Sequence, residues 1–212
     1  MSVDSLNGLE IHFKENEVAR MAKIKVVCVL LAVLCAATAR GQIAVNSRTT
    51  LLIDPREPAP IQKAAHDLAS DMTKVFGRAP HWADSPAQAS STTICIAFSH
   101  NLPRGVSKPV GWEALRIQAD RDPWPKSHVT HVVVLTGSDV RRVTYAIYQF
   151  SQQFLGVDPL YWWTDHEPRR RTVVSVPDRF VETSKPTFRY RGWFINDEDL
   201  LTGWRPGTAN GT

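Results

Sequence analysis

The sequence predicts an α/β fold in which a mixed β-sheet is flanked by helices. Residues 132–135 are apolar without alternation, which is typical of a strand buried on both faces in a parallel or mixed sheet. A Gly-Ser-Asp turn follows at 137–139, and an apolar series at helical spacing begins at Val140. A strand, a glycine turn and a helix in this order form a β–α unit.

An earlier strand–helix pair supports the same fold class. Residues 50–54 are an apolar strand, and the proline-rich residues 55–60 form a loop. From Ile61 the apolar residues recur every three or four positions up to Val75, and Gly77 ends this helix. The other predicted elements are a polar loop at 81–91, strands at 92–98, 115–118, 128–136 and 172–176, and a helix at 140–155 that ends at Gly156.

Composition excludes several classes of protein. With 43% hydrophobic and 22% charged residues in 212, the chain is neither a disordered tail nor a charge-dominated linker. The net charge is +4, but the basic residues are scattered and their longest run is residues 169–171. Nucleic-acid-binding proteins usually carry a denser basic stripe, so we expect no nucleic-acid partner.

The amino-terminal residues predict export. Lys23 and Lys25 precede an apolar run at 26–37, and Ala-Thr-Ala at 37–39 forms a cleavage site. The run is shorter than the ~20 residues of a membrane span, so we expect a signal peptide at 21–39 and no membrane association after cleavage. Residues 1–20 are interpreted as a non-native extension, and the mature protein as secreted or periplasmic. Its one remaining cysteine, Cys95, lies in an apolar strand and is expected in the core.

The pattern of the sequence indicates a domain boundary near residues 184–186. Residues 184–186 have the composition of a linker, and residues 188–195 predict a new strand. A lone strand cannot be stable without a partner, so we expect residues 186–212 to begin a second, truncated domain. Residues 45–183 then form the α/β domain.

Three groups of residues are candidates for chemistry. Asn196, Asp197 and Glu198 follow the last strand, where barrels place catalytic carboxylates, although their spacing alone favours a polar loop. The turn at 137–139 can cap a helix or cradle a phosphate, and the missing glycine-rich motif favours the cap. The aromatic and polar residues 161–166 suit an interdomain seam or the stacking of a sugar. No spacing predicts a metal site.

The chain resembles one known family in three ordered blocks. These blocks are residues 135–139 with 144–148, residues 156–159 with 161–165, and residues 190–198 with 201–204. Together they are similar to the amino-terminal part of glycoside hydrolase family 115, the xylan α-1,2-glucuronidases. The resemblance covers about residues 50–204, and Ala146 stands where the family often has glycine.

The resemblance implies a fragment of a larger enzyme. Residues 190–198 would be the first strand of a truncated TIM-like barrel, and Asn196, Asp197 and Glu198 would contact the sugar, with Asp197 foremost. The family releases glucuronic or 4-O-methylglucuronic acid from xylan with inversion and without a cofactor. Its acid and base would come from later strands, so the catalytic residues are unknown here and this chain alone is expected to be inactive.

The same resemblance implies glucuronoxylan or xylo-oligosaccharide as the partner and a homodimer of the full-length enzyme. Two alternatives remain open. One is a stand-alone carbohydrate-binding or scaffold domain, which would need residues 161–163 on the surface. The other is the amino-terminal part of a different barrel glycosidase of the hexosaminidase-like type.

Overall fold

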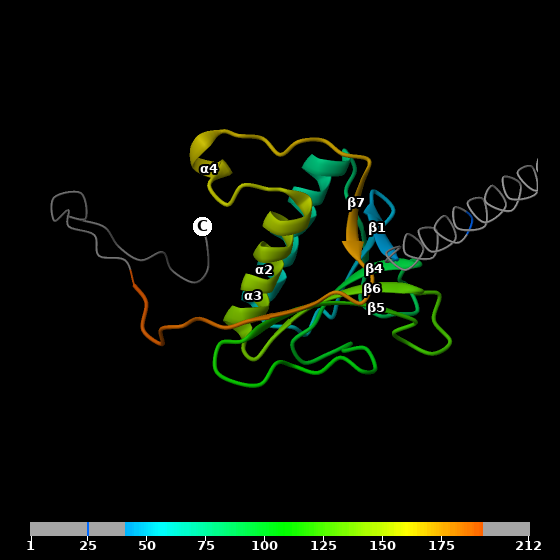
Figure 1. Ribbon diagram of the computed structural model, residues 1–212, viewed down its shortest axis with the longest axis horizontal. Helices are drawn as coiled ribbons and strands as arrows, with labels where there is room; N and C mark the ends of the chain where they lie inside the picture. Colours follow the sequence, from blue (N-terminus) through cyan, green and yellow to red (C-terminus); the bar gives the residue numbers. More distant parts are fainter. Residues whose placement is uncertain (1–24, 26–40, 193–212) are drawn as a thin grey trace, which may run out of the picture.

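A mixed six-stranded sheet with two long helices on one face forms the body of the protein (Figure 1). The computed structural model describes Lys25 and residues 41–192. The strands lie in the order β3 (His81–Ala83), β2 (Thr50–Ile53), β4 (Thr92–Ile96), β6 (His131–Gly137), β5 (Leu115–Arg121) and β8 (Val181–Ser184). The first four are parallel, while β5 is antiparallel to both β6 and β8. The predicted α/β class with a mixed sheet is therefore confirmed.

Helices α2 (Ala59–Phe76) and α3 (Val140–Phe150) lie side by side on one face of the sheet (Figure 1). Their apolar stripes meet the sheet residues that point the same way, including Val133 and Leu135 of β6. Loops cover the opposite face, where Cys95, Val132 and Val134 belong to a second cluster. The central strands are thus buried on both faces, as their unbroken apolar sequence predicted.

Strands β1 (Gln42–Asn46) and β7 (Val173–Pro177) form a separate antiparallel pair. Alternation along both strands sends Ile43, Val45, Val174 and Val176 into the main core, while the residues between them face outward. The pair thus adds apolar surface to the core that the helices share with the sheet.

The end of the second helix differs from its prediction as one continuous helix to Leu155. Helix α3 stops at Phe150, and a π-helical segment, η1 (Ser151–Leu155), completes it before Gly156. The Gly156 N–H bonds to the carbonyl of Ser151, and Gly156 takes a left-handed backbone (φ 73°) that glycine adopts without strain. The periodicity of the sequence could not show this change, because the apolar stripe continues through both segments.

Three strands were missed by the sequence interpretation. β1 was not predicted, β3 lies in what was interpreted as a polar loop, and β8 lies where no element was predicted, with its last residue, Ser184, in the expected linker. Each of these strands lies at a sheet edge or in the two-stranded pair, where one side is open to solvent and polar residues are tolerated. Their sequences therefore lack the apolar runs that revealed β2, β4 and β6.

The strand predicted at 188–195 does not form over residues 188–192, which carry no regular structure. A strand needs a neighbouring strand with which it can form hydrogen bonds, and none of those residues pairs with a described strand. Residues 193–195, the candidates Asn196, Asp197 and Glu198, the extension at 1–20 and nearly all of the signal peptide lie outside the described residues. Within the described residues, no helix combines the length and apolarity needed to cross a bilayer.

Candidate functional site

The carboxyl edge of the parallel strands, where α/β folds commonly bind ligands, is filled by a side chain of the protein itself. The buried carboxylate of Glu57 accepts hydrogen bonds from the backbone N–H groups of Phe98, Ser99 and His100, at 3.1, 2.8 and 2.9 Å. Beside it, hydrogen bonds from Arg56 hold the pKa of Asp54 well below its usual range. This edge is therefore occupied by the Glu57 side chain and the three backbone groups that donate to it.

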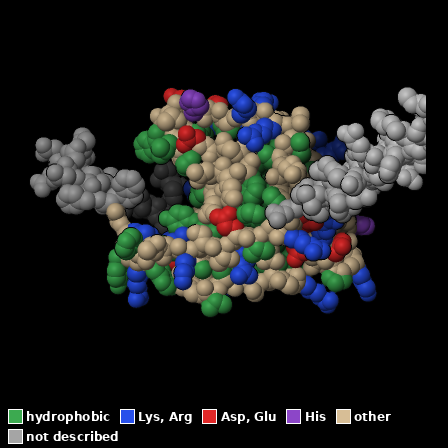
Figure 2. All heavy atoms as spheres, in the orientation of Figure 1, with side chains coloured by type: hydrophobic (Ala, Val, Ile, Leu, Met, Phe, Trp, Pro, Cys, Tyr) green, Lys and Arg blue, Asp and Glu red, His purple; other side chains and the backbone are tan. Residues whose placement is uncertain are grey.

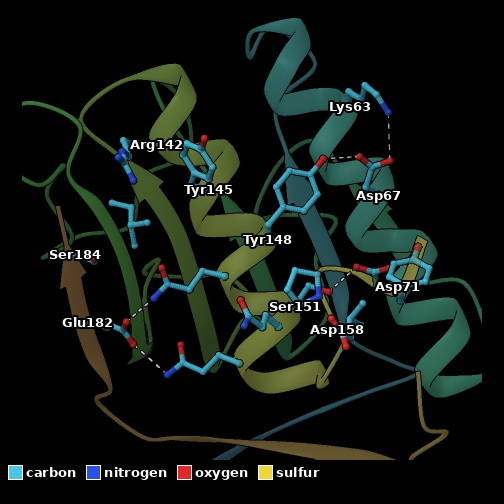
Figure 3. Close-up of a pocket in the computed structure, with 17 residues that line it drawn as sticks. Lys63, Asp67, Asp71, Arg142, Tyr145, Tyr148, Ser151, Asp158, Glu182 and Ser184 are labelled. Atoms are coloured by element: carbon cyan, nitrogen blue, oxygen red, sulfur yellow. Dashed lines mark hydrogen bonds and ion pairs between the residues drawn. The ribbon is translucent and has the colours of Figure 1, made fainter. Parts of the chain in front are cut away.

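A groove of about 1230 Å³ runs along the outer side of α3 instead (Figure 3). Helix α2 borders it with Lys63, Asp67 and Asp71, and β8 borders it with Glu182 and Ser184. Between them lies the polar side of α3 and η1, which presents Arg142, Tyr145, Tyr148, Gln149, Ser151, Gln152 and Gln153. The apolar stripe of α3 packs inward, so most of these residues face the groove with exposed surface, while Arg142 and Ser151 are buried at its edge.

Two tyrosines one turn apart form the aromatic part of the groove. Tyr145 and Tyr148 are 47% and 43% exposed, which is high for aromatic side chains. The Tyr148 hydroxyl donates to Asp67 at 2.6 Å, and Lys63 lies 3.5 Å from the same carboxylate. The guanidinium of Arg142 lies 4.9 Å from the ring centre of Tyr145. Both rings are therefore fixed by partners while keeping exposed surface.

The floor of the groove holds a buried carboxyl group. Asp71 is 6% exposed and accepts a hydrogen bond from the Ser151 hydroxyl at 2.5 Å. Burial raises the pKa of Asp71, and burial also raises the pKa of the neighbouring Tyr161 to about 12. Because Ser151 begins the π-helical segment, this contact joins α2 to the point where the helix geometry changes. Such π-helical insertions are frequent at functional sites.

Amide and carboxylate groups line the opposite wall. Glu182 on β8 accepts hydrogen bonds from Gln149 and from Gln153, the latter at 3.1 Å. Together with the tyrosines, these groups offer flat apolar faces next to planar donors and acceptors, which suits a polyhydroxylated ligand. The described residues contain no cluster of three or more His, Cys, Asp or Glu side chains that could hold a metal ion.

The sequence candidates have different outcomes. Asp139 caps α3, as predicted, by accepting a hydrogen bond from the Arg142 N–H at 3.0 Å. The Ser138 hydroxyl accepts a hydrogen bond from the Ala114 N–H and donates one to the Asp139 carboxylate. Residues 161–164 form a short helix, α4 (Tyr161–Thr164), in which Tyr161 is buried and Trp163 is 84% exposed. The aromatic motif is therefore divided between the core and the surface.

Sequence interpretation missed the groove residues Asp67, Tyr148 and Gln149. A signal was present, because tyrosines at 145 and 148 and glutamines at 149, 152 and 153 interrupt or border the apolar stripe of one helix. Their partners on α2 and β8 are distant in sequence, with separations of 81 residues for Asp67–Tyr148 and 33 for Gln149–Glu182. Only the fold brings these side chains together.

No protein-family profile matches the chain, and no curated protein sequence does either. Among solved structures, the fold is similar to that of a family GH115 4-O-methyl-α-glucuronidase with specificity for decorated arabinogalactans, with a TM-score of 0.58 and 21% identity. The match covers 80% of this chain and 22% of that enzyme, so the chain spans about a fifth of the enzyme's length. The predicted resemblance to family 115 is thus confirmed at the level of the fold.

Proposed function

We propose that this chain is the amino-terminal α/β part of a secreted, family 115-like glycoside hydrolase. The activity of the whole enzyme would be the inverting release of glucuronic or 4-O-methylglucuronic acid from decorated xylan. The observation that carries this proposal is the structural match, which takes in 80% of this chain but 22% of the glucuronidase. The ordered sequence blocks at 135–165 and 190–204 support the same assignment.

The chain by itself is proposed to be inactive. Inverting hydrolysis needs a general acid and a general base on opposite faces of the sugar, far enough apart to admit a water molecule. The carboxylates of the groove are engaged by neighbours: Asp67 by Tyr148, Asp71 by Ser151, Glu182 by two glutamines, and Asp158 by the backbone N–H of Leu160. The acid and base would belong to a barrel that follows, with Asn196, Asp197 and Glu198 contributing contacts to the sugar.

The test compares this chain with a longer product of the same reading frame. We expect a chain extended by several hundred downstream codons to release 4-O-methylglucuronic acid from glucuronoxylan, and the 212-residue chain to release none. Asp197→Ala in the long chain should lose most activity while keeping its melting temperature, and Asp84→Ala, at an exposed loop position, is the matched control. Release by the 212-residue chain, or none by the extended one, would contradict the proposal.

A second candidate function, a carbohydrate-binding domain, is favoured by the groove. The half-exposed rings of Tyr145 and Tyr148 lie among amide side chains, as sugar-binding surfaces require. Isothermal titration of the 212-residue chain with neutral xylo-oligosaccharides should then give a saturable heat of binding, and Tyr145→Ala should abolish it. The absence of a binding heat at millimolar oligosaccharide would remove this candidate.

A further inference from the structure

A second pocket, of about 310 Å³, lies where the turn after β1 meets the carboxyl end of α2. Figure 1 draws these two segments at its upper right, on the opposite side from the last described residues. Figure 2 shows basic side chains over this end of α2. We call this the arginine pocket, and the described residues that line it are Ser47, Arg48, Arg78, Ala79, Pro80 and His81.

Local hydrogen bonds fix the backbone on both sides of the arginine pocket. On one side, the Arg48 N–H donates to the Asn46 side chain at 2.8 Å, and the Arg48 carbonyl accepts from the Ser90 hydroxyl at 3.2 Å. On the other side, Gly77 ends α2 with a left-handed backbone (φ 75°), and the chain turns there into Arg78. Both arginines therefore start from backbone that is held in place.

The sheet brings these two arginines together. Strands β2 and β3 are parallel, and Thr50 at the start of β2 lies opposite His81 at the start of β3. The segments that lead into the two strands therefore run side by side. Arg48 lies in the first segment and Arg78 in the second, and both side chains line the same pocket.

No acidic side chain balances the charge of the arginine pocket. Within residues 41–192, no carboxylate oxygen lies within 4.0 Å of the guanidinium group of Arg48 or Arg78, and both side chains are exposed. A third guanidinium is close, because a Cβ atom added at Gly77 would lie 2.9 Å from the Nη1 atom of Arg170. The Arg170 charge also offsets the negative end of the α2 dipole, which would otherwise repel an anion.

These groups fit a small oxyanion that carries two negative charges. Guanidinium groups bind phosphate with paired, charge-assisted hydrogen bonds, and the hydroxyl of Ser47 and the imidazole of His81 can supply further hydrogen bonds. A phosphate ester carries a charge of about −1.5 to −2 at pH 7, which matches two unbalanced guanidinium groups better than a single carboxylate does. The pocket is at the lower end of the about 300–1,000 Å³ of ligand pockets, which suits a small group.

We propose that the arginine pocket binds phosphate or sulfate, as the free ion or as the oxyanion group of an ester, through Arg48 and Arg78. The bound group joins the turn after β1 to the end of α2. It should therefore raise the melting temperature, since a ligand that binds only the folded state stabilises that state. The site is independent of the proposed function, because it uses neither the groove nor the residues expected to begin a second domain.

The test measures binding to the 212-residue chain by isothermal titration calorimetry at constant ionic strength, because salt screens exposed charges. The probes are inorganic phosphate, inorganic sulfate, glycerol phosphate and acetate. We expect the first three to bind at least tenfold more tightly than acetate. Arg48→Gln/Arg78→Gln should weaken phosphate binding at least tenfold and leave the melting temperature in phosphate-free buffer unchanged. Tighter binding of glycerol phosphate than of inorganic phosphate would identify an ester as the source, and the reverse order the free ion.

A matched control removes two positive charges outside the pocket. Arg104→Gln/Lys185→Gln changes two exposed basic residues that do not line it, and it should alter the phosphate affinity less than twofold. Equal affinity for acetate and phosphate, an equal loss in the two double variants, or no binding heat at millimolar phosphate would overturn the proposal. Release of glucuronic acid by an extended chain is a separate measurement, so failure of the arginine pocket leaves the proposed function standing.

Discussion

The Gly137→Ala substitution tests how closely α3 approaches the end of β6. Gly137 is the last residue of β6, and the turn to α3 follows at once. A Cβ atom added there would lie 2.7 Å from three atoms: the carbonyl carbon and Cβ of Arg142 and the backbone nitrogen of Val143. Two of these atoms are backbone, so no side-chain rotation can relieve the contact and the helix itself must move.

The expected cost follows from the size of this overlap. Overpacking of a tight interior costs about 1–3 kcal/mol, and contact with backbone places this site in the upper half of that range. Replacing glycine by alanine also restricts the unfolded chain, which offsets about 0.4–1 kcal/mol. The net loss should therefore be about 2 kcal/mol in the free energy of unfolding. For a domain of this size, that corresponds to a drop of about 4–8 °C in melting temperature.

Urea denaturation followed by tryptophan fluorescence measures this loss directly. Gly192→Ala is the matched control, because it adds the same methyl group where no atom lies within 4 Å. We expect the control to remain within about 0.5 kcal/mol of the parent, as surface substitutions usually do. If Gly137→Ala also stays within 0.5 kcal/mol, or stabilises the protein, the close approach of α3 to β6 does not exist.

Three further predictions concern the core and the buried carboxyls. Phe150→Ala removes a fully buried ring that lies 5.2 Å from the ring of Phe154, and it should cost about 3–5 kcal/mol in urea denaturation, against under 1 for Tyr145→Ala. Burial raises the pKa of Asp71 in the folded state, so its stabilising contribution is complete below pH ~4 and is lost as pH rises through the raised pKa. The free energy of unfolding of the parent, relative to that of Asp71→Asn, should therefore fall from pH 4 to pH 8. A difference that stays constant over this range would refute the prediction. Cys95 is fully buried with a raised pKa, and its thiol should react with an aromatic disulfide reagent only after denaturant is added; labelling of the native mature chain within minutes would contradict this.

The parts of the fold that could be predicted from sequence are those with a long apolar pattern. Helix α2 and strands β2, β4 and β6 were found because their side chains meet the core on one or both faces. The cap at Asp139 and the stop at Gly77 were found because each depends on a local hydrogen bond or on the left-handed backbone of glycine. Strand β8 could not be found this way, since three of its four residues are exposed.

The contacts that build the groove and the cluster of arginines around Glu113 could not be predicted in this way. Asp67 meets Tyr148 across 81 residues of sequence, and Arg191 meets Glu113 across 78. No pattern within a window of ten or twenty residues carries such pairings. The family resemblance pointed to residues 196–198 as the sugar contacts, and these residues lie outside the described part of the chain.

The amino-acid sequence by itself determined the α/β class and the order of the buried elements, because burial imposes a period on neighbouring residues that can be read locally. The likeness to family 115 came instead from the resemblance of ordered blocks of residues. Only the tertiary structure decided that Glu57 fills the carboxyl edge of the sheet, that α3 turns into a π-helix at Ser151, and that three arginines share Glu113. Those features depend on contacts between distant segments, and the energy of such a contact exists only once the chain has folded.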